Sequence, residues 1–333
     1  MTRTRVGFIG AGGIAIRHLN DLIGFPDVRI AAFADPNTER ANYLAKHVGA
    51  NAYSDYRQML DGEELEAVYV CTPPFTHGEP ELDLIARELP FFVEKPLATT
   101  WETARQIAGE VEKQGLITAV GYQWRYLDIT ERAQELVRGN PARLLMGYWL
   151  DATPPPPWWR RQAESGGQMV EQTTHIFDLA RVLGGEITEV HALGSRTDRQ
   201  AFPQSDIHDV TTAALRFASG AVGSVTSTCV LRGPHRIGLH VFCEGMALEL
   251  SERELMVDLP QGRGVQPAQV DAYIREDRDF IDAVQGKENR IRAPYSEALL
   301  THRVTTAAVQ SIEEQRPIRL GDAAMSLAQR ITL

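Results

Sequence analysis

Glycine-rich residues near the start of the chain have the spacing of a dinucleotide-binding turn. A short apolar run leads into Gly10, Gly12 and Ala15, and a segment of helical period follows directly. In such a turn the first glycine permits a tight bend, the second lets the backbone approach a pyrophosphate, and the small third residue lets helix and strand pack closely. The amides at the helix N-terminus then face the phosphates. The residues expected to contact the dinucleotide are Gly10, Ala11, Gly12, Gly13 and Ile14.

An acidic residue at the end of the second expected strand indicates which dinucleotide the turn prefers. Asp35 lies 35 − 12 = 23 residues after Gly12, close to the interval of about 20 that is usual in this fingerprint. A carboxylate at this place binds the ribose hydroxyls of NAD and repels the additional phosphate of NADP. Arg40, on the following helix, is the nearest cation that could accommodate that phosphate. The predicted cofactor is therefore NAD, with NADP kept as the alternative.

Polar side chains also follow two later strands. The segment Cys71–His77 comes after one expected strand, and Glu94 and Lys95 come at the end of the next. In open α/β sheets, ligands bind at the carboxyl ends of the strands. A lysine at such an edge, partly shielded from water, is suited to passing a proton. Lys95 is therefore a candidate catalytic residue.

A third group of reactive side chains lies in the second half of the chain. Glu171, His175 and Asp178 are spaced by four and three positions, so on one continuous helix they share a face. Such a face can present a base and the group that orients it. The same side chains are of metal-ligand type, but no second ligand set accompanies them, and we predict no metal.

The pattern of elements predicts how these residues are positioned. At 333 residues, with 43% apolar and 23% charged residues, the chain is expected to form two globular domains. Up to about residue 120, short apolar runs alternate with helical segments, which is typical of βαβ units. The expected strands are Val6–Ile9, Val28–Ala34, Ala67–Cys71, Phe91–Glu94 and Ile117–Val120. The expected helices are Ile14–Ile23, Thr38–Val48, Glu79–Arg87 and Thr100–Gln114.

After Tyr122 the pattern changes to strands of period two with turns between them. The expected strands here are Leu144–Leu150, Val210–Phe217, Ala221–Val230, Ile237–Cys243, Met246–Leu250 and Leu255–Leu259. The expected helices are Thr130–Arg138, Met169–Leu183, Val270–Val284 and Ser296–Glu314. The fold class is therefore α/β: a Rossmann domain with a doubly wound parallel sheet over residues 1–122, and an α+β domain with a mostly antiparallel open sheet over residues 123–333.

Charge and cysteine content exclude several classes of partner. The formal net charge is −10, and an acidic surface repels nucleic acid and anionic lipid. No apolar stretch reaches the roughly 18 residues of a membrane span, and glycines interrupt the N-terminal apolar run at once, so no leader or membrane anchor is expected. The three cysteines lack metal or disulfide spacing, which favours a reducing cytoplasm.

The glycine turn, Asp35 and the tripeptide Glu94-Lys95-Pro96 together make the chain resemble the glucose-fructose oxidoreductase / inositol dehydrogenase / MocA family over almost its whole length. The resemblance implies that Lys95 contacts the substrate hydroxyl and the nicotinamide region. It also implies that Glu94 contacts the nicotinamide ribose or pairs with Lys95. The residues that resemble the family's cofactor-side loop are Thr72, Pro73 and His77, although a structural hydrogen-bonding role suits His77 equally well.

The resemblance continues into the second half, with two departures. One is Gln172-Thr173-Thr174, where the family commonly has a glycine. The family has an aspartate four residues before its histidine; this chain has Glu171 before an unaltered His175. The longer side chain can shift the substrate position, so the substrates of well-known members do not transfer directly. Tyr122 and Arg125, in a segment like the family's aromatic-arginine link, are candidate ligands for substrate hydroxyls or a carboxylate, while Trp124 and Tyr126 of the same segment are candidate core residues. Trp158 follows four prolines and is a candidate lid residue, or part of a surface or subunit-contact loop.

The expected function is hydride transfer between NAD and a hydroxyl-bearing carbon of a sugar, polyol or sugar derivative. Lys95 and His175 would share the general-base work, with Glu171 orienting His175. Two alternatives use the same residues: an NAD-dependent glycosidase with transient redox chemistry, and a non-catalytic NAD-binding regulatory protein. Family members commonly associate through the face of the second-domain sheet, which implies a homodimer or homotetramer.

Overall fold

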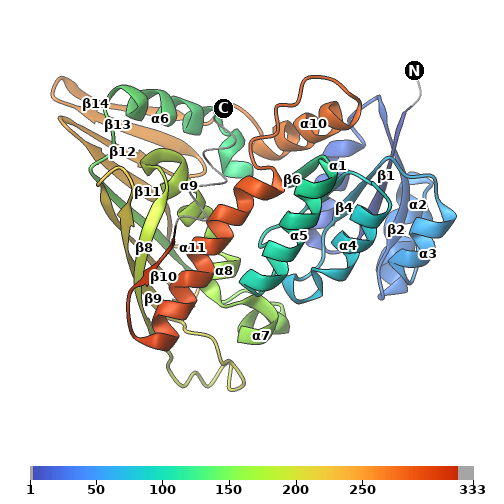
Figure 1. Ribbon diagram of the computed structural model, residues 1–333, viewed down its shortest axis with the longest axis horizontal. Coiled ribbons are helices and arrows are strands. Elements are labelled where there is room, and N and C mark those ends of the chain that lie inside the picture. Colours follow the sequence, from blue (N-terminus) through green and yellow to red (C-terminus); the bar gives the residue numbers. More distant parts are fainter. Residues whose placement is uncertain (1–2, 322–333) are drawn as a thin grey trace. The chain divides into compact units, whose positions relative to one another are not determined.

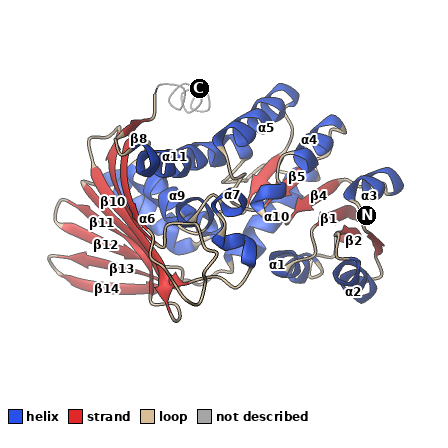
Figure 2. Ribbon diagram, turned by 90° about the horizontal axis from the view of Figure 1, so that it is seen from below, coloured by secondary structure: helices blue, strands red, loops and turns tan. Residues whose placement is uncertain are grey.

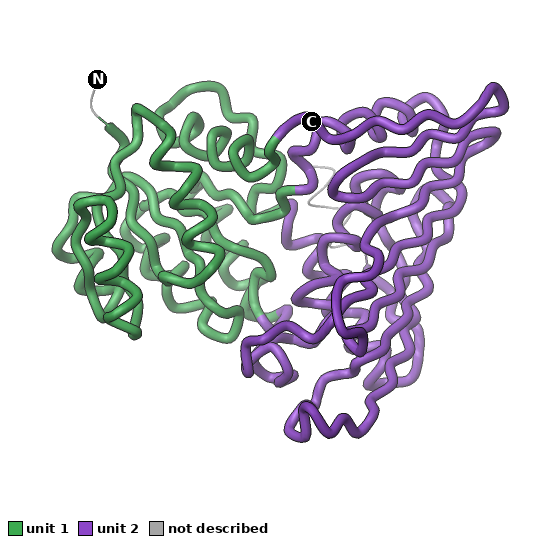
Figure 3. The backbone as a smooth tube through the Cα atoms, turned by 180° about the vertical axis from the view of Figure 1, so that it is seen from behind, with its two compact units in different colours: residues 1–98, 102–123, 271–296 green, residues 99–101, 124–270, 297–333 purple. Residues whose placement is uncertain are grey.

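The computed structural model describes residues 3–321, so the last twelve residues of the second predicted domain lie outside the described part. The chain forms two compact units, coloured separately in Figure 3. The first consists of residues 1–98, 102–123 and 271–296, and the second of residues 99–101, 124–270 and 297–333. The segment 271–296 thus belongs to the first unit, although it follows most of the second unit in the sequence. The predicted single boundary after residue 122 assigns this segment to the second domain.

The first unit is built on a parallel six-stranded sheet in the order β3-β2-β1-β4-β5-β6, labelled in Figure 1. Its strands are β1 (Thr4–Ile9), β2 (Val28–Ala34), β3 (Asn51–Tyr53), β4 (Ala67–Val70), β5 (Phe91–Val93) and β6 (Thr118–Val120). Its helices are α1 (Gly13–Leu22), α2 (Thr38–Val48), α3 (Tyr56–Gly62), α4 (Glu79–Ala86), α5 (Trp101–Gln114) and α10 (Ala272–Val284). The predicted Rossmann topology is confirmed, and the strand order reverses between β1 and β4, where such folds bind dinucleotides.

Aromatic side chains hold the central strands together. Phe8 of β1 stacks on Phe33 of β2 and on Tyr69 of β4, with ring centroids 5.1 and 5.2 Å apart. Tyr69 stacks in turn on Phe92 of β5 at 4.9 Å. All four rings are fully buried, and offset stacking of this kind adds to the free energy gained by burial. These stacked rings hold together strands β2, β1, β4 and β5, and the candidate site lies at the carboxyl ends of these strands.

The second unit is built on a nine-stranded sheet in the order β14-β13-β12-β11-β7-β10-β9-β8-β15. Its strands are β7 (Leu144–Ala152), β8 (Ile187–Ser195), β9 (Val210–Phe217), β10 (Val222–Leu231), β11 (Arg236–Cys243), β12 (Met246–Leu250), β13 (Glu254–Leu259), β14 (Gly262–Pro267) and β15 (Ile318–Arg319). The pairing of β7 with β10 is parallel and the other pairings are antiparallel, so the prediction of a mostly antiparallel sheet is confirmed.

Helices cover one face of this sheet (Figure 2). The helices of the unit are α6 (Asp128–Gly139), α7 (Gln162–Ser165), α8 (Gln168–Glu171), α9 (Thr174–Gly184) and α11 (Tyr295–Glu314). Side chains alternate strictly along β9, where every second residue is buried and the others are exposed. Because strand side chains alternate between the two faces, one face of the sheet lies against the helices and the other presents its side chains outward.

The helix predicted over Met169–Leu183 is two helices, and that prediction was wrong. The chain turns between α8 and α9: the Thr173 amide donates to Gln168 O, five residues back, and the His175 amide donates to Gln172 O. The apolar period continues through the turn, which is why the sequence reads as one helix. The C-terminal end is as predicted, since Gly185 adopts φ 88° and its amide donates to Arg181 O.

Candidate active site

The glycine turn of the first unit has the geometry that a dinucleotide requires. Gly10 adopts φ 97°, and a Cβ there would lie 2.4 Å from the carbonyl oxygen of Cys71, so only glycine fits. At Gly12 and Gly13 a Cβ would meet no protein atom within 4 Å. Packing within the protein therefore does not explain these two glycines, whereas the close approach of a bound pyrophosphate does. Ala15 is fully buried, as the predicted helix–strand contact requires.

The carboxylate of Asp35 lies against the same turn. Its Oδ2 accepts a hydrogen bond from the Ala11 amide at 2.8 Å, and its Oδ1 accepts one from the Asn37 amide at 2.7 Å. These bonds hold a half-exposed carboxylate beside the start of α1. The amide of Arg40 donates to the side chain of Asn37, which caps α2.

His77 ties together the loops that follow β4 and β5. Its Nε2 lies 3.0 Å from Thr72 O and its Nδ1 lies 3.2 Å from Leu97 O, and the imidazole is buried. The geometry supports the structural alternative for His77. The buried hydroxyl of Thr72 has no hydrogen-bond partner among residues 3–321, and Thr72 and Pro73 are half-buried at the end of β4. This loop therefore offers the Thr72 hydroxyl to a ligand at the carboxyl edge of the sheet.

Glu94 and Lys95 follow β5 at that edge. The Glu94 side chain is almost fully buried, its Oε1 lies 3.0 Å from His18 Nε2, and its Oε2 accepts a hydrogen bond from the Lys95 amide at 3.2 Å. Lys95 itself is half-buried. His18 could not be identified from the sequence, because a single histidine in an amphipathic helix belongs to no motif and its partner Glu94 lies 76 residues away.

In the second unit, Glu171 is held by Trp159, the residue after the lid candidate Trp158. The indole Nε1 of Trp159 donates to Glu171 Oε2 at 2.6 Å. Trp159 is 1% exposed and packs with Ile207 and Cys229, while the half-buried Trp158 packs against this cluster. Trp159 is thus a core residue that positions a carboxylate. No spacing rule predicts an indole–carboxylate bond across twelve residues.

His175 lies in the first turn of α9 and is 5% exposed. Its ring stacks on Trp149 of β7, with centroids 5.8 Å apart and planes 22° apart. Because α8 ends at Glu171, the expectation that Glu171, His175 and Asp178 share one continuous helical face was wrong. Within residues 3–321 these three side chains do not form a group with ligand atoms close enough to share a metal ion.

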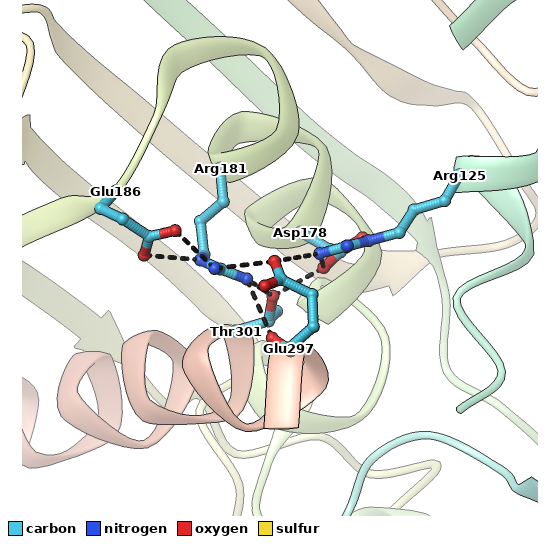
Figure 4. A network of polar contacts seen from close by, with 6 residues as sticks. All are labelled: Arg125, Asp178, Arg181, Glu186, Glu297 and Thr301. Carbon is cyan, nitrogen blue, oxygen red and sulfur yellow. Dashed lines mark hydrogen bonds and ion pairs between the residues drawn. The ribbon is translucent and has the colours of Figure 1, made fainter. Parts of the chain in front are cut away.

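Asp178 and Arg125 belong to a buried ionic network, shown in Figure 4. Arg125 donates from Nε and Nη2 to the two carboxylate oxygens of Asp178, both at 2.7 Å, and Nη2 lies 3.2 Å from Glu297 Oε1. Burial opposes the charge of Arg125, but Asp178 and Glu297 outweigh it and raise the pKa of the guanidinium. The network also contains Arg181, Glu186 and Thr301.

This geometry bears on the two candidate substrate ligands near residue 125. Arg125 is 7% exposed and its guanidinium is committed to carboxylates of its own unit. Tyr122 is 1% exposed, on the first unit. Trp124 and Tyr126, the candidate core residues of this segment, are buried as well. Tyr122 and Arg125 do not enter the function proposed below.

Comparison with known proteins decides the family. Residues 4–122 match the GFO_IDH_MocA model, described as an oxidoreductase family with an NAD-binding Rossmann fold, and residues 134–249 match the GFO/IDH/MocA C-terminal domain. The chain belongs to the GFO/IDH/MocA family. The resemblance inferred from the glycine turn and the Glu94-Lys95-Pro96 tripeptide is confirmed, and so is NAD as the cofactor of the family to which this chain belongs.

Relatives of this GFO/IDH/MocA protein match over nearly its full length. Myo-inositol 2-dehydrogenase of Thermotoga maritima is 28% identical, with 95% of this chain and 98% of the relative covered. The scyllo-inositol 2-dehydrogenase (NAD(+)) of Bacillus subtilis is 26% identical, with 96% of each covered. Levoglucosan dehydrogenase in complex with NADH shares the fold with a TM-score of 0.85 at 22% identity, covering 96% of this chain and all of that one.

The cofactor of the family fits the residues present. The open space at Gly12 and Gly13, the Asp35 carboxylate beside the turn and the buried Thr72 hydroxyl are the groups that would hold NAD. No helix within residues 3–321 of this GFO/IDH/MocA protein is long and apolar enough to cross a membrane.

Proposed function

We propose that this GFO/IDH/MocA protein is an NAD-dependent dehydrogenase acting on a CH–OH group of a polyol, sugar or sugar derivative. The observation that carries the proposal is the position of Lys95. It stands at the carboxyl end of β5, on the same sheet edge as the glycine turn, with its amide bonded to the buried carboxylate of Glu94. Two relatives named as inositol 2-dehydrogenases, matched over almost the whole chain, support a polyol as the substrate class.

The proposed chemistry divides the substrate's two hydrogens. Bound NAD would supply the acceptor for the hydrogen of the reacting carbon and its electron pair. Lys95 takes the hydroxyl proton, so the alcohol becomes a carbonyl, and the proton then leaves to solvent. His175 is the second proposed proton acceptor. Glu171, fixed by the Trp159 indole, is proposed to orient it. General acid–base groups of this kind contribute about 10²- to 10⁴-fold to the rate.

A substrate panel tests the proposal. The purified protein would be mixed with NAD or NADP and with inositols, alditols, aldoses and sugar acids, and the absorbance of the reduced nicotinamide would be followed. Reduction of NAD with at least one hydroxyl compound is expected. Consumption of a glycoside without net reduction would favour the NAD-dependent glycosidase instead. NAD binding with no turnover on any compound would favour the regulatory protein.

Asp35 is expected to set the preference for NAD over NADP. Replacing it by serine removes a charged acceptor for the ribose hydroxyls and the repulsion of a 2′-phosphate, so the ratio of the NADPH to the NADH Kd should fall about 10- to 100-fold. Fluorescence titration with both cofactors measures this ratio. Glu39→Gln, which removes an exposed charge in the first turn of α2, is the matched control. An unchanged ratio in the serine variant would show that Asp35 does not read the ribose.

The outward face of the nine-stranded sheet is the proposed surface for a homodimer or homotetramer. Leu144 and Val222 are paired across β7 and β10, Met146 lies two residues along β7, and all three are more than a third exposed. A contiguous apolar patch on a sheet face is typical of a subunit interface.

Met146→Glu is therefore expected to break the oligomer, because a charge at the centre of an apolar contact must lose its water when the subunits associate. Light scattering after gel filtration should show a multiple of 37.0 kDa for the unaltered protein and 37.0 kDa for the variant. Ile23→Glu places the same charge on an exposed apolar residue of the first unit and should leave the mass unchanged. A variant that keeps the original mass would place the interface elsewhere.

We propose that this protein is located in the cytoplasm. The structure leaves Cys71, Cys229 and Cys243 unpaired. Free thiols are typical of a reducing compartment, which supports the cytoplasm.

A further inference from the structure

A chain of buried charged groups in the first unit leads to the backbone of Lys95. His18 of α1 is fully buried. Its Nδ1 lies 2.8 Å from Asp277 Oδ1 of α10, and its Nε2 lies 3.0 Å from Glu94 Oε1. The second carboxylate oxygen of Glu94 accepts the Lys95 amide at 3.2 Å. Three elements far apart in the sequence are thus joined through one imidazole.

The two bonds of His18 determine its charge. Both partners are carboxylates, which accept hydrogen bonds when ionised, so each ring nitrogen donates to an ionised partner. Burial raises the pKa of Asp277, and the charge and hydrogen bond of His18 oppose this rise. Burial opposes the charged ring, but Asp277 and Glu94 outweigh it and raise the pKa of His18 well above its ordinary value. The ring centroids of Tyr69, Phe92 and Tyr273 lie within 6.0 Å of the centroid of the His18 ring, and these aromatic rings exclude water from the charged imidazole. Charged hydrogen bonds shielded in this way are strong and directional.

The other titratable groups facing His18 do not replace these partners. Glu276 of α10 is fully buried, neither of its oxygens has a hydrogen-bond partner among the described residues, and burial raises its pKa well above the ordinary value. Glu276 therefore holds its proton and adds no charge. On α1, burial raises the pKa of Asp21 to about 6, against the opposing effect of Arg17. The phenol of Tyr69, whose pKa burial also raises, stays neutral.

The carboxylate of Glu94 is confined on its other side by the backbone after β6. A Cβ on Gly121 would lie 2.4 Å from Glu94 Oε1. With glycine at this position, the chain at Gly121 leaves room for the Glu94 carboxylate where it bonds to His18. A larger residue at position 121 would have to displace the carboxylate from this place.

We propose that Asp277 and His18 are positioning residues that fix Glu94 and, through its bond to the Lys95 amide, hold Lys95 in its working place. Asp277 orients the imidazole of His18, and the imidazole orients the carboxylate of Glu94. This carboxylate then holds the backbone amide of Lys95. The catalytic consequence rests on the proposed function of Lys95. The structural consequence, an anchored Lys95 amide, does not.

Amide hydrogen exchange in the cofactor-free protein tests the anchor directly. His18→Gln and Asp277→Asn should both speed exchange in the peptide covering residues 91–98, which contains the Lys95 amide. A peptide covering β9, in the second unit, should keep its rate, which distinguishes local release from general unfolding. Glu276→Gln is the matched control, because it lies beside Asp277, is equally buried and only replaces a neutral acid by an amide; exchange over residues 91–98 should not change.

A double-mutant cycle on turnover tests whether the residues act as one chain. His18→Gln should lower kcat about 10²-fold, the scale for a displaced catalytic group, with a smaller change in the KM for NAD. The double variant His18→Gln, Asp277→Asn should be no worse than His18→Gln alone, since coupled residues are not additive.

Three results would overturn the proposal. These are unchanged exchange over residues 91–98 in His18→Gln, additive losses in the double variant, and one equivalent of bound metal ion that Glu276→Gln removes. The third would mean that His18, Glu94 and Glu276, whose ligand atoms lie within 4.8 Å of one another, hold a metal ion instead. Failure of the proposed function looks different: the unaltered protein would show no turnover on the substrate panel, while His18→Gln would still release the Lys95 amide.

Discussion

Replacing Lys95 by methionine is expected to lower kcat about 10²- to 10⁴-fold, because this is what a positioned proton acceptor contributes. Methionine keeps the length of the side chain and removes the amine. The glycine turn, Asp35 and Glu94 remain, so the Kd for NADH should change little. Stopped-flow turnover and a fluorescence titration on the same sample separate the two quantities.

The control for this variant is Lys113→Met, which removes an amine from the exposed end of α5, where it pairs with Glu110. Its kcat and its NADH affinity should equal those of the unaltered protein. If the Lys95 variant retained full turnover, another group would have to accept the hydroxyl proton. If it lost NADH binding to the same degree as turnover, Lys95 would be a binding residue and not a catalytic one.

Replacing Arg125 by methionine is expected to lower the free energy of unfolding by about 3–5 kcal/mol, because it leaves the buried carboxylate of Asp178 without its cation. The side chain makes two bonds of 2.7 Å to Asp178, which is 1% exposed. Thr301 still donates to Asp178, and Arg181 still pairs with Glu297, but neither replaces the planar bidentate pair. Chemical denaturation followed by circular dichroism measures the loss.

Arg263→Met provides the comparison, since Arg263 pairs with Asp258 in solvent and exposed pairs contribute only about 0–1 kcal/mol. The two variants together show whether Arg125 binds substrate or stabilises the fold through its ion pair with Asp178. A substrate ligand would raise KM and leave unfolding unchanged. A large loss of stability agrees with the network of Figure 4.

The sequence predicted those parts of the fold that depend on local pattern. The glycine turn, Asp35 and the strands with continuous apolar runs were identified because their constraints act within a few residues: Gly10 needs its positive φ and β1 needs burial on both faces. The short strand β3 and helix α3 were missed because three and seven residues are too few to show a period. The strand β8 and the edge strands β14 and β15 were missed as well.

The parts of the site that depend on tertiary contacts could not be predicted. His18 bonds to residues 76 and 259 positions away. Trp159 bonds to Glu171, from which it is separated in the sequence by α7 and the turn between α7 and α8. The apolar period of α10 is the same whichever unit it packs against, so its return to the first unit has no sequence signal. The turn at Gln172–Thr173 is fixed by backbone hydrogen bonds that the side-chain pattern does not reveal.

Transfer of deuterium tests the central claim most directly. Myo-inositol carrying deuterium on its ring carbons, or the corresponding form of whichever polyol supports turnover in the substrate panel, would be incubated with the protein and NAD, and the nicotinamide product analysed by mass spectrometry. The proposed dehydrogenase predicts one deuterium in each NADH formed, with no transfer by the Lys95→Met variant above its residual turnover. Product formed without deuterium in the cofactor would contradict hydride transfer from a CH–OH carbon.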